Sequence, residues 1–171
     1  MYRINASPIS MTTKEYNISV EQHADAVFRF VLKNIKDEEK AKDIIQDTFE
    51  KLWIKAESVS FEKVKSYIFT AAYHTMIDYI RKDQKQTVLD DVNVQKHSHS
   101  RQYSDLSEIL KEAIDLLPKI QKSVILLRDY EGYSYKEIAD ITKLNESQVK
   151  VYIFRARKFL QNYIGTIEAV L

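Results

Sequence analysis

The chain contains no cysteine, and only 2 glycines and 2 prolines among its 171 residues. Without cysteine there is no disulfide framework, no thiolate zinc site and no cysteine nucleophile. Sandwiches and barrels need many tight turns, which glycine and proline favour, so these folds are excluded. Gly132 and Gly165 alone cannot build a glycine-rich phosphate-binding loop.

A membrane span and an excess of charge of one sign are also missing. No apolar run approaches the ~18 residues of a membrane span, and Met1 to Ser19 lack the charged head and apolar stretch of a signal peptide. The 26 Lys and Arg residues nearly balance the 25 Asp and Glu residues, so any basic surface must be local. The hydrophobic fraction of 44% is enough for a core, and we expect a cytoplasmic, all-helical protein.

Helical periodicity divides the chain into two blocks. Apolar residues recur at helical spacing in three stretches of residues 20–82 and again through residues 105–171. The pattern breaks over residues 83–104, which predicts a flexible linker. Residues 1–19 contain no periodic element and are expected to form an N-terminal extension. The fold class expected is therefore all-α, with two small helical domains joined by a linker.

The most informative segment covers residues 134–160. Ser134 precedes Glu137 with the spacing of a capping box, and Asn145 can cap a second helix after a short turn. A short helix followed by a longer basic helix is typical of a helix-turn-helix. Serine and glutamine at the start of such a helix can contact base edges, and lysine and arginine beyond them can contact phosphates. The alternative is a solvated surface helix.

Two segments of the first block have suggestive compositions. Residues 67–82 combine four aromatic side chains with cations, which suits single-stranded nucleic acid, although such aromatics also pack in cores. Asp43, Asp47 and Glu50 are spaced to share one helical face. That face is either a docking surface for a basic partner or a solvated stripe.

The chain offers little catalytic chemistry. His97 and His99 form an H-x-H pair in the expected linker, without a third ligand at a suitable spacing. Asp90 and Asp91 are adjacent and point in different directions on any regular backbone. We therefore expect no enzyme, no metal site and no cofactor.

Four segments follow one another with a polar stretch between the second and the third. They are AKDIIQDTFEKLW (41–53), YIFTAAYHTMIDYIRK (67–82), LLPKIQKSVILLRDYEGYSYKEIA (116–139) and QVKVYIFRARKFL (148–160). Together they resemble the extracytoplasmic-function (ECF) sigma factors, the minimal two-domain class of bacterial RNA polymerase specificity subunit. The resemblance implies that the chain binds core RNA polymerase and promoter DNA and directs promoter-specific initiation. It also implies an anti-sigma factor as a partner.

The resemblance assigns three surfaces to this chain. Region 2 would dock on core polymerase through Asp43, Gln46, Asp47, Glu50 and Trp53. Region 2 would also recognise and melt the −10 element through Phe61, Lys63, Tyr67, Tyr73, His74, Asp78, Arg81 and Lys82. The loop at 58–63 lies where family members capture a flipped base. Region 4 would read the −35 duplex through Ser134, Tyr135, Lys136, Ser147, Gln148, Lys150, Val151, Tyr152, Phe154, Arg155 and Lys158.

The chain departs from the family pattern in both DNA-reading segments. Tyr73 and His74 stand where the family usually has arginine followed by asparagine, so we expect a −10 element unlike the common type. In region 4, Lys143 replaces the usual turn glycine, and Val151 and Tyr152 replace common Ser and Arg residues. Two alternatives remain open: a stand-alone helix-turn-helix regulator that does not depend on core polymerase, and a helical interaction protein that binds no nucleic acid.

Overall fold

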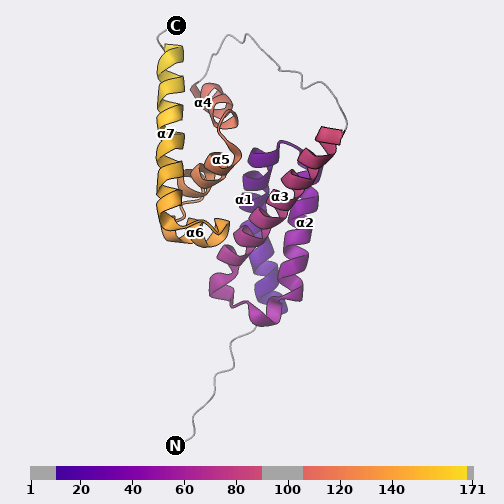
Figure 1. The fold of residues 1–171 in the computed structure, drawn as a ribbon. Helices are drawn as coiled ribbons and strands as arrows, with labels where there is room; N and C mark the ends of the chain where they lie inside the picture. The colour runs from indigo at the N-terminus through magenta and orange to yellow at the C-terminus, as the bar shows by residue number, and fades with distance from the viewer. Residues whose placement is uncertain (1–10, 90–105, 169–171) are drawn as a thin grey trace, which may run out of the picture. The chain divides into compact units, whose positions relative to one another are not determined.

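The computed structural model describes residues 11–89 and 106–168, and this part of the chain contains helices and short connections but no β-strand (Figure 1). One compact unit contains α1 (Thr13–Ile35), α2 (Glu38–Ile54) and most of α3 (Val64–Leu89). The other contains α4 (Leu106–Asp115), α5 (Lys119–Ile125), most of α6 (Tyr135–Thr142) and α7 (Glu146–Glu168). The expected all-α fold with two small helical domains is confirmed. No described helix is long and apolar enough to cross a membrane.

α1 begins at Thr13, which corrects the expected start near residue 20. The hydroxyl of Thr12 accepts a hydrogen bond from the Glu15 N–H at 3.2 Å, and the Glu15 carboxylate accepts one from the Thr12 N–H at 2.7 Å. Ser19 is fully buried, and the Met11 N–H donates to the carbonyl of Ala56 at 2.9 Å. Residues 11–19 thus pack with the first unit. A capping box carries no hydrophobic period, which is why periodicity alone misses this start.

The three helices of the first unit lie side by side around one core (Figure 1). The ring centroids of Phe30 in α1 and Phe69 in α3 are 5.7 Å apart, and both rings are buried. A polar contact also joins α2 to α3, because the Lys51 ammonium donates to the Thr75 hydroxyl at 2.7 Å. Buried apolar side chains surround these contacts: Val27, Val31, Ala41, Ile44, Leu52, Ile68, Ala72 and Met76.

The segments on either side of α3 set what the first unit can present. Two 3-10 turns, Ala56–Ser58 and Phe61–Lys63, connect α2 to α3. α3 continues to Leu89, so the first part of the expected linker is helical. The rest of that linker, with Asp90, Asp91, His97 and His99, lies outside the described residues, as do residues 1–10.

The second unit is built around α7, against which α4 and α5 pack. The Lys122 ammonium is buried in this unit and pairs with the Asp115 carboxylate at 2.7 Å. After α5 the chain makes a π-helical turn, Leu126–Tyr130. Gly132 follows at φ 75°, a left-handed conformation that a residue with a side chain rarely adopts.

Candidate docking and nucleic-acid surfaces

The outer face of α2 carries the expected docking residues. All of them are exposed: Asp43, Gln46, Asp47, Glu50 and Trp53. Among the described residues, none of the three carboxylates forms an ion pair. Lys51, one turn after Asp47, donates instead to Thr75, and Lys42 pairs with Glu38 at 2.7 Å. The acidic charge of this face is therefore available to a basic partner.

Trp53 ends this face and is held half open by α1. Its side chain is 51% exposed. Its ring meets that of Tyr16 edge to face, with centroids 4.9 Å apart and an interplanar angle of 72°. The Tyr16 hydroxyl donates to the Phe49 carbonyl at 3.2 Å, which fixes the Tyr16 ring on α2. Periodicity did not include Tyr16 in the first helix, although the Thr12–Glu15 capping box was a local signal for it.

A polar stripe runs along one face of α3. It starts at Lys63, the last residue of the 3-10 turn before α3. Its members then recur every three or four residues, the spacing of one helical face: Tyr67, Thr70, His74, Asp78 and Arg81. Lys82 is exposed beside the stripe, and Phe61 is half-buried in the turn before it. Thr70 was not among the expected site residues, but it lies within the stripe.

Tyr73 does not belong to this stripe. It is 4% exposed and lies on the core face of α3 with Phe69 and Met76. The expectation that Tyr73 contacts DNA is corrected, because burial leaves its ring no surface to present. His74, the next residue, is half-buried on the stripe, and its ring meets that of Tyr73 edge to face at 5.3 Å.

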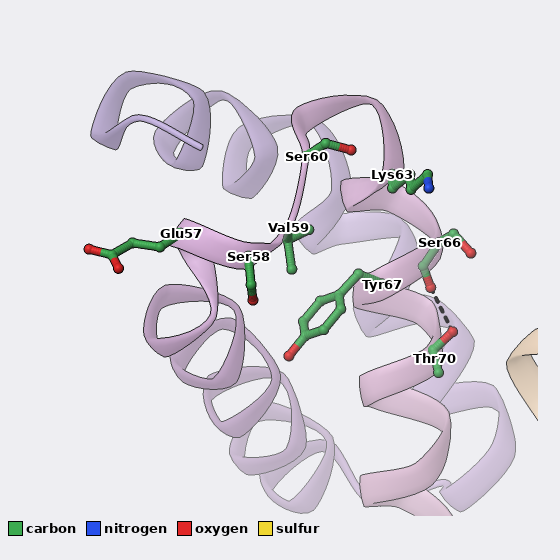
Figure 2. Close-up of a pocket in the computed structure, with 8 residues that line it drawn as sticks. All are labelled: Glu57, Ser58, Val59, Ser60, Lys63, Ser66, Tyr67 and Thr70. Carbon is green, nitrogen blue, oxygen red and sulfur yellow. Dashed lines mark hydrogen bonds between the residues drawn. The ribbon is translucent and has the colours of Figure 1, made fainter. Parts of the chain in front are cut away.

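A pocket of about 490 Å³ opens where the stripe begins. Figure 2 shows the Tyr67 ring toward its centre, while Glu57 points away from it. The Thr70 hydroxyl donates to the Ser66 carbonyl at 2.7 Å, and burial raises the pKa of Tyr67. A stacking ring, hydroxyls and one ammonium suit a planar polar group such as a nucleobase. The lining residues are Glu57, Ser58, Val59, Ser60, Lys63, Ser66, Tyr67 and Thr70.

The two caps expected for the helix-turn-helix are present. The Ser134 hydroxyl accepts from the Glu137 N–H at 3.2 Å, and the Glu137 carboxylate accepts from the Ser134 N–H at 2.8 Å. Asn145 Oδ1 accepts from the Gln148 N–H at 2.8 Å, and Gln148 Oε1 accepts from the Asn145 N–H at 2.9 Å. Between the helices, Lys143 takes the left-handed conformation at φ 61°.

α7 presents one polar and basic face, because Val149, Ile153 and Ala156 bury the other. The expected DNA-reading residues of α7 are exposed, except half-buried Tyr152: Ser147, Gln148, Lys150, Val151, Phe154, Arg155 and Lys158. Ser134 and Lys136 are exposed and Tyr135 is half-buried at the start of α6. Since the side-chain oxygen of Gln148 is engaged in the cap, its amide NH₂ is the group that can meet a base acceptor. Phe154, 66% exposed, offers apolar contact to a thymine methyl group.

No group of histidine, aspartate and glutamate side chains within residues 11–89 and 106–168 is arranged to hold a metal ion. The carboxylates, cations and aromatic rings on the described surfaces are suited to contacts with charged and planar groups.

Comparison with known proteins finds two family matches, Sigma-70 region 2 over residues 19–86 and Sigma-70, region 4 over residues 107–160. The chain is 32% identical over 152 residues to the RNA polymerase sigma factor SigV of Bacillus subtilis (strain 168), covering 88% of this chain and 92% of that protein. It is 31% identical over 149 residues to the ECF RNA polymerase sigma factor SigM of the same organism, covering 82% and 90%.

Two solved structures share the fold. One is the sigma factor RpoE in complex with the anti-sigma factor NepR from Bartonella quintana, with a TM-score of 0.76, 26% identity, and coverage of 90% of this chain and 98% of that chain. The other is CnrH in complex with the cytosolic domain of CnrY, with a TM-score of 0.65, 18% identity, and coverage of 91% and 90%.

Proposed function

Because this chain belongs to the sigma-70 family as an ECF RNA polymerase sigma factor, we propose a specific role for each of its surfaces. The first unit, as region 2, docks on core polymerase through α2 and opens the −10 element through α3. The second unit, as region 4, reads the −35 element through α6 and α7. Neither role requires a catalytic group, and we propose that the chain has no enzymatic activity of its own.

The exposed acidic face of α2 carries this proposal. Asp43, Asp47 and Glu50 are on the surface without ion pairs among the described residues, and Trp53 is half open beside them. An aromatic anchor rimmed by charge is the usual make-up of a protein docking site. A stand-alone helix-turn-helix regulator would have no need for this face, so the face favours docking on polymerase.

Opening of the −10 element would use the stripe of α3 and the pocket at its start. Unstacking a base costs a few kcal/mol, and stacking on an aromatic side chain returns about 1–3 kcal/mol per base. Tyr67 supplies the ring, and Lys63, Arg81 and Lys82 supply charge for the phosphates of the separated strand. Tyr73 supports this face from the core.

Recognition of the −35 element would place the start of α7 in the major groove. Ser147 and the amide NH₂ of Gln148 then face base edges, and Arg155 and Lys158 face phosphates. Val151 and Phe154 favour a thymine in the element.

We also propose an anti-sigma factor as a regulatory partner, since the similar RpoE of Bartonella quintana was solved with one. A factor that works with polymerase on the chromosome acts in the cytoplasm, and we propose that location for this chain.

The test compares two variants with a matched control. Asp47→Arg should weaken binding to purified bacterial core polymerase, whereas Glu21→Arg, the same charge change on exposed α1, should not. Arg155→Ala should reduce promoter-directed transcription and leave core binding intact. Equal core binding by the Asp47 and Glu21 variants would remove α2 as the docking surface. Tight, specific binding of duplex DNA by the free protein, with none to core polymerase, would favour the stand-alone regulator.

A further inference from the structure

A cluster of five side chains surrounds the start of α6, and we name it the Tyr135 cluster: Arg128, Asp129, Tyr135, Lys150 and Arg157. The Arg128 guanidinium lies over the Tyr135 ring at 4.8 Å, and the Lys150 ammonium lies 5.7 Å from the same ring centroid. A cation in this position is attracted to the negative face of the aromatic ring. The ring thus has a cation from the π-helical turn Leu126–Tyr130 and another from α7.

A two-point ion pair joins the same elements. Arg157 Nη2 lies 2.6 Å from Asp129 Oδ1, and Arg157 Nε lies 3.3 Å from Asp129 Oδ2. This hydrogen bonding to Asp129 raises the pKa of Arg157. Bidentate pairing of arginine with a carboxylate fixes orientation as well as distance. α7 is therefore tied at Arg157 to the turn that precedes α6.

The π-helical turn supplies both anchors of the cluster. Arg128 and Asp129 are consecutive in Leu126–Tyr130, so their side chains leave the turn in different directions. Arg128 reaches Tyr135 and also donates to the Tyr133 carbonyl at 2.8 Å. Asp129 reaches Arg157. One turn thereby holds the beginning of α6 and the middle of α7 at once.

We propose that the Tyr135 cluster fixes the angle between α6 and α7 and thereby sets how strongly the second unit prefers the −35 sequence over unrelated DNA. The inference rests on the proposed −35 role of the second unit. α6 has only 8 residues, which is too short for a helix to be stable without tertiary contacts. Tyr135 and Lys150 were expected as DNA contacts, and the cluster gives their ring and ammonium a role within the protein.

Charge makes the inference testable, because its two possible consequences have opposite signs. If Asp129 were only an acid near a DNA-binding face, Asp129→Asn would remove repulsion and strengthen binding to any duplex. If Asp129 positions α7 through Arg157, the same variant weakens binding to the −35 element and leaves binding to unrelated duplex unchanged or stronger. We expect the ratio of the affinity for the −35 duplex to the affinity for unrelated duplex to fall by about three- to fivefold. A change of this size is what the loss of a well-aligned surface ion pair produces.

The experiment uses the protein bound to core polymerase and two duplexes, one with the −35 sequence selected from a promoter library and one with it scrambled. Four proteins are compared with the wild type: Asp129→Asn, Arg157→Lys, the charge swap Asp129→Arg with Arg157→Asp, and the control Glu108→Gln on exposed α4. Asp129→Asn and Arg157→Lys should lower the binding ratio at unchanged core affinity. The swap should recover part of it, and the control should match the wild type.

Two results overturn the inference. If Asp129→Asn binds each duplex as tightly as the wild type does, or more tightly, and the ratio of the two affinities is unchanged, the ion pair does not position α7. If the swap is as poor as the single variants, the effect comes from local charge and not from pairing. A wild-type protein that prefers no −35 sequence is a different result, because it refutes the proposed function itself.

Discussion

Replacing Tyr67 is the sharpest probe of strand opening. The Tyr67 hydroxyl lies 3.4 Å from the Lys51 carbonyl, which is at the outer limit of a hydrogen bond and contributes little. The ring, in contrast, lines the pocket at the start of α3 (Figure 2). If the ring stacks on one displaced base, Tyr67→Ala removes about 1–3 kcal/mol from the open complex. That loss corresponds to about a 5- to 150-fold lower equilibrium for opening. Tyr67→Phe should stay close to the wild type.

The assay is permanganate reactivity of unpaired thymines in the −10 region, with holoenzyme formed on a linear promoter. A template with a pre-melted bubble is the control, since it needs no unstacking and should reduce the defect of Tyr67→Ala. Because Tyr67 is half-buried, thermal unfolding of each variant is measured alongside. The reasoning fails if Tyr67→Ala opens the promoter normally, or if Tyr67→Phe is as defective as Tyr67→Ala.

Three further outcomes follow from other parts of the molecule. Trp53→Ala should weaken core binding by about 2 kcal/mol, as expected for a half-open aromatic anchor. Tyr16→Phe keeps the ring that supports Trp53 and should leave core binding unchanged. Titration of core polymerase with labelled protein measures both affinities. Lys122→Ala should lower the free energy of unfolding by about 1–3 kcal/mol, because Asp115 loses a buried partner. Replacing both partners by apolar side chains, Lys122→Met with Asp115→Leu, should cost less, because no carboxylate is then left without its partner; urea unfolding measures both. Burial, and then the charge of Lys65, lower the pKa of His23 below its ordinary 6.5. As the pH falls, the unfolded chain therefore binds a proton at this histidine before the folded chain does. The stability that is present above pH 6.5 is lost as the pH falls toward the lowered pKa of the folded protein. His23→Gln should flatten that acid limb in unfolding measured from pH 7 to 5, and an unchanged limb would contradict the assignment.

Sequence was sufficient where a feature depends on neighbours in the chain. The caps at Ser134 and Asn145 are local, and both are present. The all-α class followed from the scarcity of turn residues and from helical periodicity. The start of α1 was missed because a capping box and polar residues give no hydrophobic period, although Thr12 and Glu15 carried the signal.

Sequence was insufficient where the third dimension decides. The family resemblance assigned Tyr73 to DNA, but its position one turn from Phe69 and Met76 puts it on the core face of α3. The pairing of Asp129 with Arg157 could not have been read from the chain, because it depends on a π-helical turn that aims the carboxylate at a residue far along the sequence.

The lysine in the turn between α6 and α7 bears on how this protein can evolve. Lys143 holds φ 61°, a conformation that costs a residue with a side chain about 1–2 kcal/mol and glycine almost nothing. Its charge lies at the C-terminal end of α6, where the helix dipole favours a cation, and beside the helix proposed to enter DNA. Glycine at this position would relax the backbone and remove that charge. One substitution at this position therefore changes two properties in opposite directions. Glycine would raise the stability of the fold, and lysine raises the rate of association with DNA, so selection for one property would reduce the other.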